Sequence, residues 1–171
     1  MSNFFKHATY VLVTFSLLVA TSIASAQEVR VPTEVKFAAN SNVRAAVINE
    51  CDLQTKLPEF LRTYGKKNGI DVVLSKKALH KKQKGRVLLL EITSVSGAGG
   101  GAWSGPKSVS VKGSLYKNGT FIGNFTASRA SGGGFFGAYK GTCAILGRCV
   151  KTLGSDIAKW LKNPSKNAHL G

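Results

Sequence analysis

The densest group of side chains that could bind a ligand is a run of cations in the middle of the chain. Between residues 66 and 86 this run is accompanied by a single acid, Asp71. Clustered cations attract anions, whereas an equally simple interpretation is a solvated connection between two elements. Because no aromatic residues interleave with the lysines, single-stranded nucleic acid is a less suitable partner. The candidate binding residues of this run are Lys76, Lys77, Lys81, Lys82, Lys84 and Arg86.

A second group of candidate binding residues is aromatic and lies in two glycine-rich segments, 97–105 and 131–141. Exposed rings there would form a recognition rim on the loops. The interpretation we favour is that the rings fold back and cap the core, while the glycines supply the bends. Neither segment contains the Gly-x-x-x-x-Gly-Lys pattern of a phosphate-binding loop. The four rings are Trp103, Phe135, Phe136 and Tyr139.

The three cysteines allow one disulfide and one free thiol. Cys143 and Cys149 would be separated by about 9 Å on one continuous helix, which is too far for a bond. Cys51, at the end of the first helical piece, can meet Cys143, at the start of the last helix, if both helices lie on the same face of the sheet. We therefore expect these two to pair, and Cys149 to be a small buried hydrophobe. No Cys-x-x-Cys or other metal-ligand spacing occurs, so neither a metal nor a cofactor is expected.

No catalytic set is visible, because the eight carboxylates are scattered and none has a histidine within reach in the sequence. This favours a non-enzymatic binding or envelope-associated protein whose basic surface holds an anionic partner. The alternative is a periplasmic hydrolase or other enzyme with a site assembled from distant residues.

The amino terminus has the three-part layout of a cleavable export signal. Lys6 precedes an apolar stretch from Tyr10 to Ala20, and Ala24-Ser25-Ala26 stands before Gln27. We expect cleavage near Ala26 and a single soluble domain, residues 27–171, in the periplasm or outside the cell. Because the full chain has a formal net charge of +16, the expected partners are lipopolysaccharide, phospholipid or another anionic polymer of the envelope rather than nucleic acid.

Alternating apolar residues predict the strands. The first, Val29 to Phe37, is broken by Pro32 and suits a sheet edge. The run from Val87 to Val95 suits the sheet centre, and Asn118-Gly119 predicts a tight hairpin. The remaining predicted strands span residues 70–74, 107–117 and 120–130.

Apolar spacings of three and four predict two helical regions. The first runs from Val43 to Tyr64 in two pieces, the second piece beginning near Thr55 with Pro58 in its first turn. The other runs from about residue 142 to 161, and the tail beyond Pro164 is expected to fray. The order of elements predicts an α+β fold, with two layers, a mostly antiparallel sheet of about five strands and helices on one face.

Three sequence pieces resemble a family of uncharacterised exported bacterial proteins: residues Glu50 to Pro58, Gly141 to Leu146 and Leu153 to Leu161. More loosely, the glycine-rich strands with a closing helix are similar to small envelope lipoproteins and to auxiliary domains of transport systems. The resemblance implies a periplasmic location and no active-site residues. Unlike the lipoprotein members, this chain has no cysteine before Cys51, and thus no site for a lipid at the cleavage point.

Overall fold

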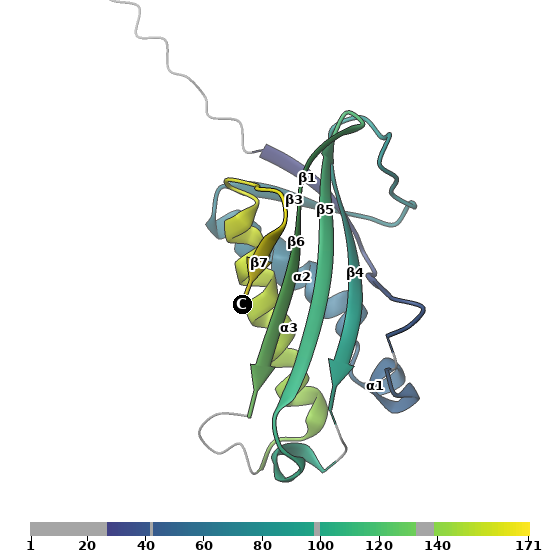
Figure 1. Cartoon of the computed structure of the whole chain (residues 1–171), viewed down its shortest axis with the longest axis vertical. Coiled ribbons are helices and arrows are strands. Elements are labelled where there is room, and N and C mark those ends of the chain that lie inside the picture. Colours follow the sequence, from purple (N-terminus) through teal and green to yellow (C-terminus); the bar gives the residue numbers. More distant parts are fainter. Residues whose placement is uncertain (1–26, 42, 98–99, 133–138) are drawn as a thin grey trace, which may run out of the picture.

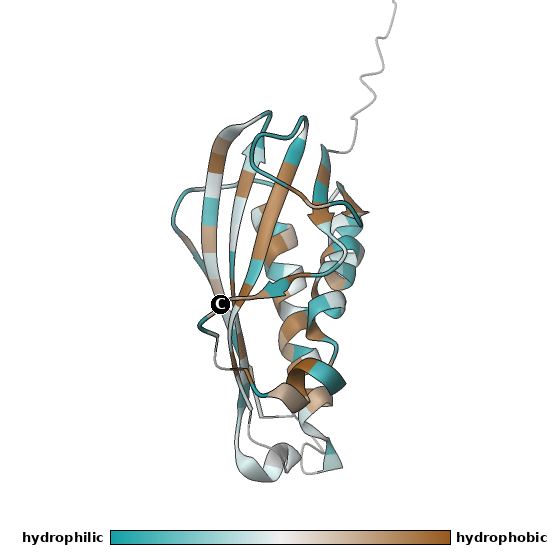
Figure 2. Cartoon of the chain, turned by 90° about the vertical axis from the view of Figure 1, so that its right-hand side faces the viewer, coloured by the Kyte–Doolittle hydropathy of each residue, from teal (hydrophilic) through white to brown (hydrophobic). Residues whose placement is uncertain are grey.

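The computed structural model describes residues 27–41, 43–97, 100–132 and 139–171, so the predicted export signal lies outside the described residues. The described part is an α+β fold of two layers, with the helices on one face of the sheet (Figures 1 and 2). This confirms the predicted class and layers. Its elements are β1 (Gln27–Pro32), β2 (Lys36–Phe37), α1 (Ala45–Glu50), α2 (Leu53–Lys67), β3 (Ile70–Ser75), β4 (Arg86–Ser96), the 3₁₀-helix η1 (Gly101–Ser104), β5 (Lys107–Lys117), β6 (Thr120–Ser131), α3 (Thr142–Trp160) and β7 (Ala168–Leu170).

The sheet has seven strands rather than about five, and it is mixed. Its order is β3-β1-β4-β5-β6-β7, with β2 also paired to β4. The long pairs β4–β5 and β5–β6 are antiparallel, whereas β1–β3, β1–β4, β2–β4 and β6–β7 are parallel. The parallel pair β1–β3 arises because α1 and α2 lie between these strands in the chain, and a helical crossover returns the chain in the same direction.

The first predicted strand is broken at Pro32 as expected, but it is not at an edge. β1 lies between β3 and β4, and β2 continues along β4 after the break. An internal position is possible because Pro32 is the last residue of β1, and β4 pairs with this strand only at Arg30. The proline therefore removes no hydrogen bond from the middle of the ladder.

Two local predictions about the antiparallel strands are confirmed. β4 lies in the interior of the sheet, and β5 and β6 form the predicted hairpin. Asn118 and Gly119 join them with φ angles of 50° and 86°, which are the left-handed values that a two-residue turn of this kind requires.

Helix α2 begins earlier than predicted, at Leu53, so Pro58 lies in its second turn. A proline there cannot donate to the carbonyl of Gln54, four residues earlier. That carbonyl accepts instead from the backbone N–H of Val35, at 3.0 Å. The contact outside the helix thus satisfies the group that the proline leaves free, which explains why the helix tolerates it.

The apolar core lies between the sheet and the helices α2 and α3 (Figure 2). At Gly154 the two helices approach so closely that a Cβ would lie 2.8 Å from Phe60 Cβ. Across the sheet, the ring of Phe125 occupies the place that a side chain at Gly113 would need, and it meets the Trp160 ring edge-on at 4.9 Å between centroids. Both glycines therefore make room for close packing.

The tail beyond Pro164 is ordered, which corrects the prediction that it frays. Residues Ala168–Leu170 form β7, parallel to β6. Asn124 and Asn167 fix this strand, because the Asn167 N–H donates to Asn124 Oδ1 at 2.9 Å and the Asn124 amide donates back to Asn167 Oδ1 at 3.2 Å.

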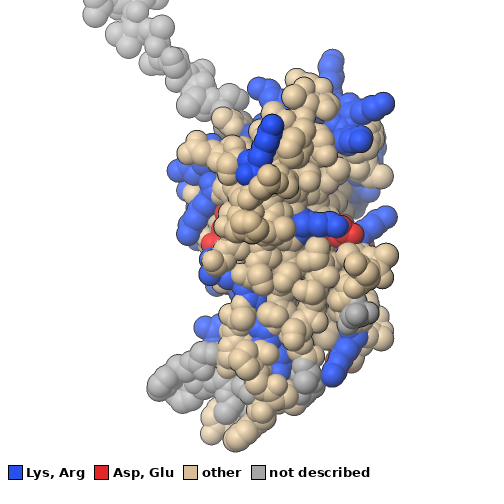
Figure 3. Space-filling model, viewed as in Figure 1, with Lys and Arg blue, Asp and Glu red and all other residues tan. Residues whose placement is uncertain are grey.

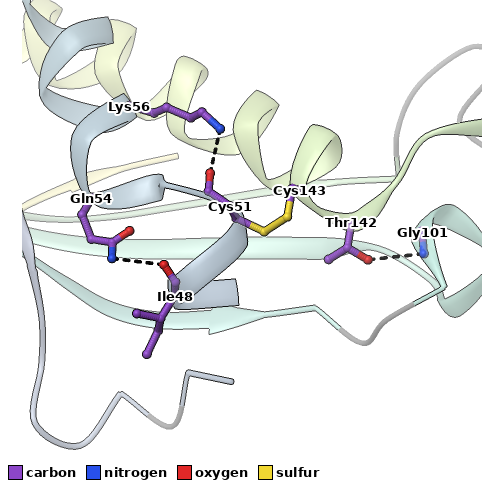
Figure 4. The surroundings of a disulfide bond; sticks show 7 residues. All are labelled: Ile48, Cys51, Gln54, Lys56, Gly101, Thr142 and Cys143. Carbon is purple, nitrogen blue, oxygen red and sulfur yellow. Dashed lines mark hydrogen bonds between the residues drawn. A yellow bond between two sulfur atoms is a disulfide. The ribbon is translucent and has the colours of Figure 1, made fainter. Parts of the chain in front are cut away.

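The predicted disulfide between Cys51 and Cys143 is present, and Cys149 is a buried free cysteine. The bond joins the residue after α1 to the first turn of α3 (Figure 4). Beside it, Lys56 Nζ donates to the Cys51 carbonyl at 2.7 Å. The disulfide thus links α1 to α3 covalently at one end of the helical layer.

Candidate functional site

The described residues form an open groove of about 840 Å³. Its floor is the face of β4, β5 and β6 that points away from the helices, and it carries Glu91, Lys112, Ser114, Tyr116 and Thr126. The wall is formed by residues 32–34, Lys36 and residues 75–79, and the Thr33 N–H donates to the Ser75 carbonyl at 3.0 Å. The volume is within the range of about 300–1,000 Å³ typical of ligand sites.

The groove carries more positive than negative charge. Four lysines line it against two glutamates, Glu34 and Glu91. Lys112 Nζ lies 2.6 Å from Glu91 Oε2, and strand pairing places Lys36 beside Glu91 from the other side. The lysines are Lys36, Lys76, Lys77 and Lys112, and only the last of them takes part in an ion pair between described residues.

A second, smaller hollow of about 330 Å³ continues along the same face of the sheet. Thr126 lines both hollows, so the two are neighbours on this face. Four of the smaller hollow's nine lining residues carry hydroxyl groups, and a fifth is His169, whose Nδ1 lies 2.9 Å from Thr126 Oγ1. Hydroxyl and imidazole groups can donate and accept hydrogen bonds, so the track suits a polar, extended ligand.

The structure divides the predicted lysine cluster into two parts. Lys76 and Lys77 line the groove, whereas Lys81, Lys82 and Lys84 are exposed farther along the same connection between β3 and β4. Basic side chains gather over this connection at the upper right of Figure 3.

The connection that carries these lysines is tied to the sheet at its far end. The Gly85 N–H donates to Asn118 Oδ1 at 2.8 Å, and the Asn118 N–H donates to the Gly85 carbonyl at 2.9 Å. Arg30 also donates to the Lys84 carbonyl at 3.3 Å. The wall of the groove is therefore anchored to the β5–β6 hairpin turn.

Arg86, the last predicted binding residue of the cluster, forms hydrogen bonds that join parts of the fold. Its guanidinium donates to Gln27 Oε1 and, at 3.2 Å, to the Leu161 carbonyl. Partial burial lowers its pKa, but an arginine remains protonated in proteins. Arg86 thus joins the start of β4 to the end of α3 and does not line the groove.

The two described aromatic rings contradict the interpretation that they cap the core. Trp103 is 84% exposed and Tyr139 is 88% exposed. Both lie at the same end of the sheet, because η1 packs against the start of α3. Phe135 and Phe136 lie outside the described residues.

Among the described residues, no three His, Cys, Asp or Glu side chains are grouped as metal ligands. The helices of the described ranges include none that is long and apolar enough to cross a bilayer.

Comparison with known proteins shows a likeness only at the level of structure. No family model matches the chain, and no curated protein matches it. A crystal structure of an uncharacterized protein has a TM-score of 0.51 at 15% identity, over 80% of this chain and 92% of that chain. At this identity the likeness shows the fold alone.

Two other solved structures are similar with TM-scores below 0.5. A PelC dodecamer from Paraburkholderia phytofirmans gives 0.47 at 16% identity, over 78% of this chain and 89% of that chain. A minor lipoprotein from Acinetobacter baumannii gives 0.40 at 14% identity, over 79% of this chain and 90% of that chain.

The sequence analysis did not single out the residues of the groove floor. Lys112, Ser114 and Thr126 come from β5 and β6, and Lys36 comes from β2. The one available signal was the polar half of the alternation in residues 108–114, which marks a face that no helix covers.

Proposed function

We propose that this protein is a non-enzymatic module that binds an extended anionic polymer in the groove on the open face of its sheet. The observation that carries the proposal is the set of four lysines, from three separate parts of the chain, around a hydroxyl-lined floor. Lysines supply mobile positive charge for carboxylate or phosphate groups, while serine and threonine hydroxyls bond the neutral parts of the ligand. The neighbouring second hollow would give an extended polymer a further place of contact on the same face.

We further propose that the protein works outside the cytoplasm, after cleavage near Ala26. A disulfide between Cys51 and Cys143 supports this, because such bonds persist in oxidising compartments. Cell fractionation followed by amino-terminal sequencing should find a mature chain that begins at Gln27 in the exported fraction. A chain that keeps residues 1–26 in the cytoplasm would contradict the proposal.

The groove is tested with polygalacturonate as a carboxylated polymer, inorganic polyphosphate as a phosphorylated one, and dextran as a neutral one. Titration calorimetry on the protein and on Lys76→Ala/Lys77→Ala should show binding of an anionic polymer that the double variant weakens about fivefold or more, since exposed ion pairs contribute about 0.2–1 kcal/mol each. Dextran should not bind.

The matched control is Lys81→Ala/Lys82→Ala, which removes the same charge from the same connection but outside the groove. We expect this variant to bind almost as well as the unmodified protein. Equal losses in the two variants would mean that general charge, rather than the groove, holds the polymer.

The same samples test the enzymatic alternative, because Glu34 and Glu91 both line the groove. The chain length of each polymer is measured after prolonged incubation. Unchanged length supports a binding role. Shortening that is lost in Glu34→Gln or Glu91→Gln would replace this proposal by a hydrolase.

A further inference from the structure

One end of the molecule presents two large aromatic side chains to solvent. Trp103 belongs to η1, and Tyr139 lies just before α3. Their exposed fractions, 84% and 88%, are about twice those of the other exposed large hydrophobics in the described ranges, which lie between 36% and 39%. We call this end, made by η1 and residues 139–142, the aromatic tip; it lies at the bottom of Figure 1.

The two halves of the aromatic tip are joined to each other. The Gly101 N–H donates to Thr142 Oγ1 at 3.3 Å (Figure 4). Gly101 has a φ of 59°, and a Cβ at this position would collide with the Lys140 carbonyl oxygen. A glycine is therefore needed for the close approach that brings both aromatic residues to one end.

A buried lysine at the start of β5 forms hydrogen bonds that anchor η1. Lys107 is 0% exposed, and its Nζ donates to Ser104 Oγ and to the Gly105 carbonyl, each at 2.8 Å. Ser104 Oγ in turn lies 3.1 Å from the Gly101 carbonyl. The turn that carries Trp103 is thus fastened at both of its ends, although the indole itself is exposed.

The charge of this end matches an anionic surface. No Asp or Glu occurs in the sequence between Glu91 and Asp156, while this stretch contains Lys140, Arg148 and Lys151. Asp156 is itself paired with Arg129, at 2.8 Å. The segments that form this end therefore carry cations and no acid, although Glu50 and Asp52 flank Cys51, the disulfide partner of Cys143.

We propose that the aromatic tip docks on an anionic phospholipid bilayer, with Trp103 and Tyr139 in the headgroup region. Tryptophan and tyrosine favour this depth because their rings are apolar and their N–H or O–H groups remain hydrated. Nearby cations add attraction to anionic lipids. Each ring is set singly among small residues such as Gly101 and Gly105. This arrangement suits insertion between lipid headgroups, whereas a protein interface presents a continuous, packed apolar patch.

This docking goes beyond the proposed function, because the groove lies on a different surface, formed by other residues. A molecule held by its tip leaves the face of β4, β5 and β6 open to a polymer. The two activities can therefore be lost separately.

Tryptophan fluorescence tests the docking directly. The chain contains two tryptophans, and Trp160 is 6% exposed in the core, so a change on adding vesicles reports on Trp103. With vesicles of phosphatidylcholine and phosphatidylglycerol, we expect a blue shift and quenching by brominated acyl chains. No shift with these vesicles, or a shift that depends on protein concentration without any vesicle, would overturn the proposal.

The decisive variants are Trp103→Ser/Tyr139→Ser and Trp103→Phe/Tyr139→Phe, compared by vesicle sedimentation. We expect the serine variant to bind about tenfold more weakly, because it loses most of the apolar area that enters the headgroup region, and the phenylalanine variant to keep most of the binding. Equal binding by the two variants would overturn the proposal.

Cross-tests separate failure of the tip from failure of the groove. The serine variant should bind the anionic polymer with unchanged affinity, and Lys76→Ala/Lys77→Ala should keep the vesicle-induced blue shift. Loss of polymer binding together with vesicle binding in the serine variant would show that the tip is not an independent site.

Discussion

Lys107 Nζ lies 2.8 Å from Ser104 Oγ, and this contact places a fully buried ammonium group beneath an exposed turn. The ammonium group donates to neutral oxygens, those of Ser104 and Gly105. A buried charge without a carboxylate partner costs free energy, so the residue contributes to the position of the turn rather than to global stability.

Replacing this lysine by an apolar side chain of similar length should therefore separate stability from local order. In Lys107→Met we expect an unchanged or higher free energy of unfolding, because the cost of burying the charge disappears. Hydrogen exchange at residues 101–105 should become faster, because η1 loses its anchor. Urea unfolding and exchange measured by mass spectrometry check both effects. A loss of more than about 2 kcal/mol would show that the ammonium stabilises the whole fold.

The two tryptophans should differ sharply when each is changed to alanine. Trp103→Ala should alter the free energy of unfolding by less than about 0.5 kcal/mol, because the side chain is 84% exposed. Trp160→Ala should cost about 3–5 kcal/mol, because it removes the ring that packs against Phe125. Thermal melts of the two variants check this, and a large loss in Trp103→Ala would contradict its exposed position.

Stability at alkaline pH should depend on Cys149. Burial raises the pKa of the Cys149 thiol, although the positive charge of Arg148 acts in the opposite direction. The folded state therefore keeps the proton at a pH where the unfolded chain loses it. The free energy of unfolding should fall as the pH rises above about 8.5, the ordinary value for a thiol.

The control for this titration is Cys149→Ala, which should lack that part of the decline. The difference between the two proteins, measured by urea unfolding from neutral to alkaline pH, isolates the thiol. A constant difference across this range would mean that the thiol ionises equally in both states.

Polymer binding should be sensitive to salt. The lysines of the groove wall, Lys76 and Lys77, are exposed, and charges of this kind are screened over about 10 Å at 0.1 M ionic strength. We expect the affinity for polygalacturonate to fall between low and moderate salt, as measured by titration calorimetry. Affinity that persists at high salt would indicate that uncharged contacts dominate.

Local chemistry made part of this fold predictable. Asn118 and Gly119 specify a turn by themselves, and the disulfide follows from helix geometry and three cysteines. By contrast, β7 has three residues and depends on the contact between Asn124 and Asn167, which are 43 positions apart. A strand of three residues is too short to show a detectable alternation of apolar and polar residues.

The groove was hidden for a related reason. Lys36 lies beside Glu91 only because β2 pairs with β4 in parallel. Lys112, on the other neighbouring strand, forms an ion pair with the same glutamate. The pairing register between strands that are far apart in the chain cannot be read from the local alternation of apolar and polar residues. The exposure of Trp103 was equally hard to foresee, because a glycine-rich segment has no apolar period that tells which way a ring points.

The covalent link between α1 and α3 also constrains the order of events during synthesis. Its two cysteines are separated by 92 positions, and the stretch between them contains α2 and strands β3 to β6. In the proposed export, with the amino terminus leading, Cys51 enters the oxidising compartment before its partner and cannot form this bond until most of the chain has arrived. A chain that is interrupted before α3 lacks Cys143 and cannot form the disulfide, so the bond is present only in chains that have been synthesised as far as α3.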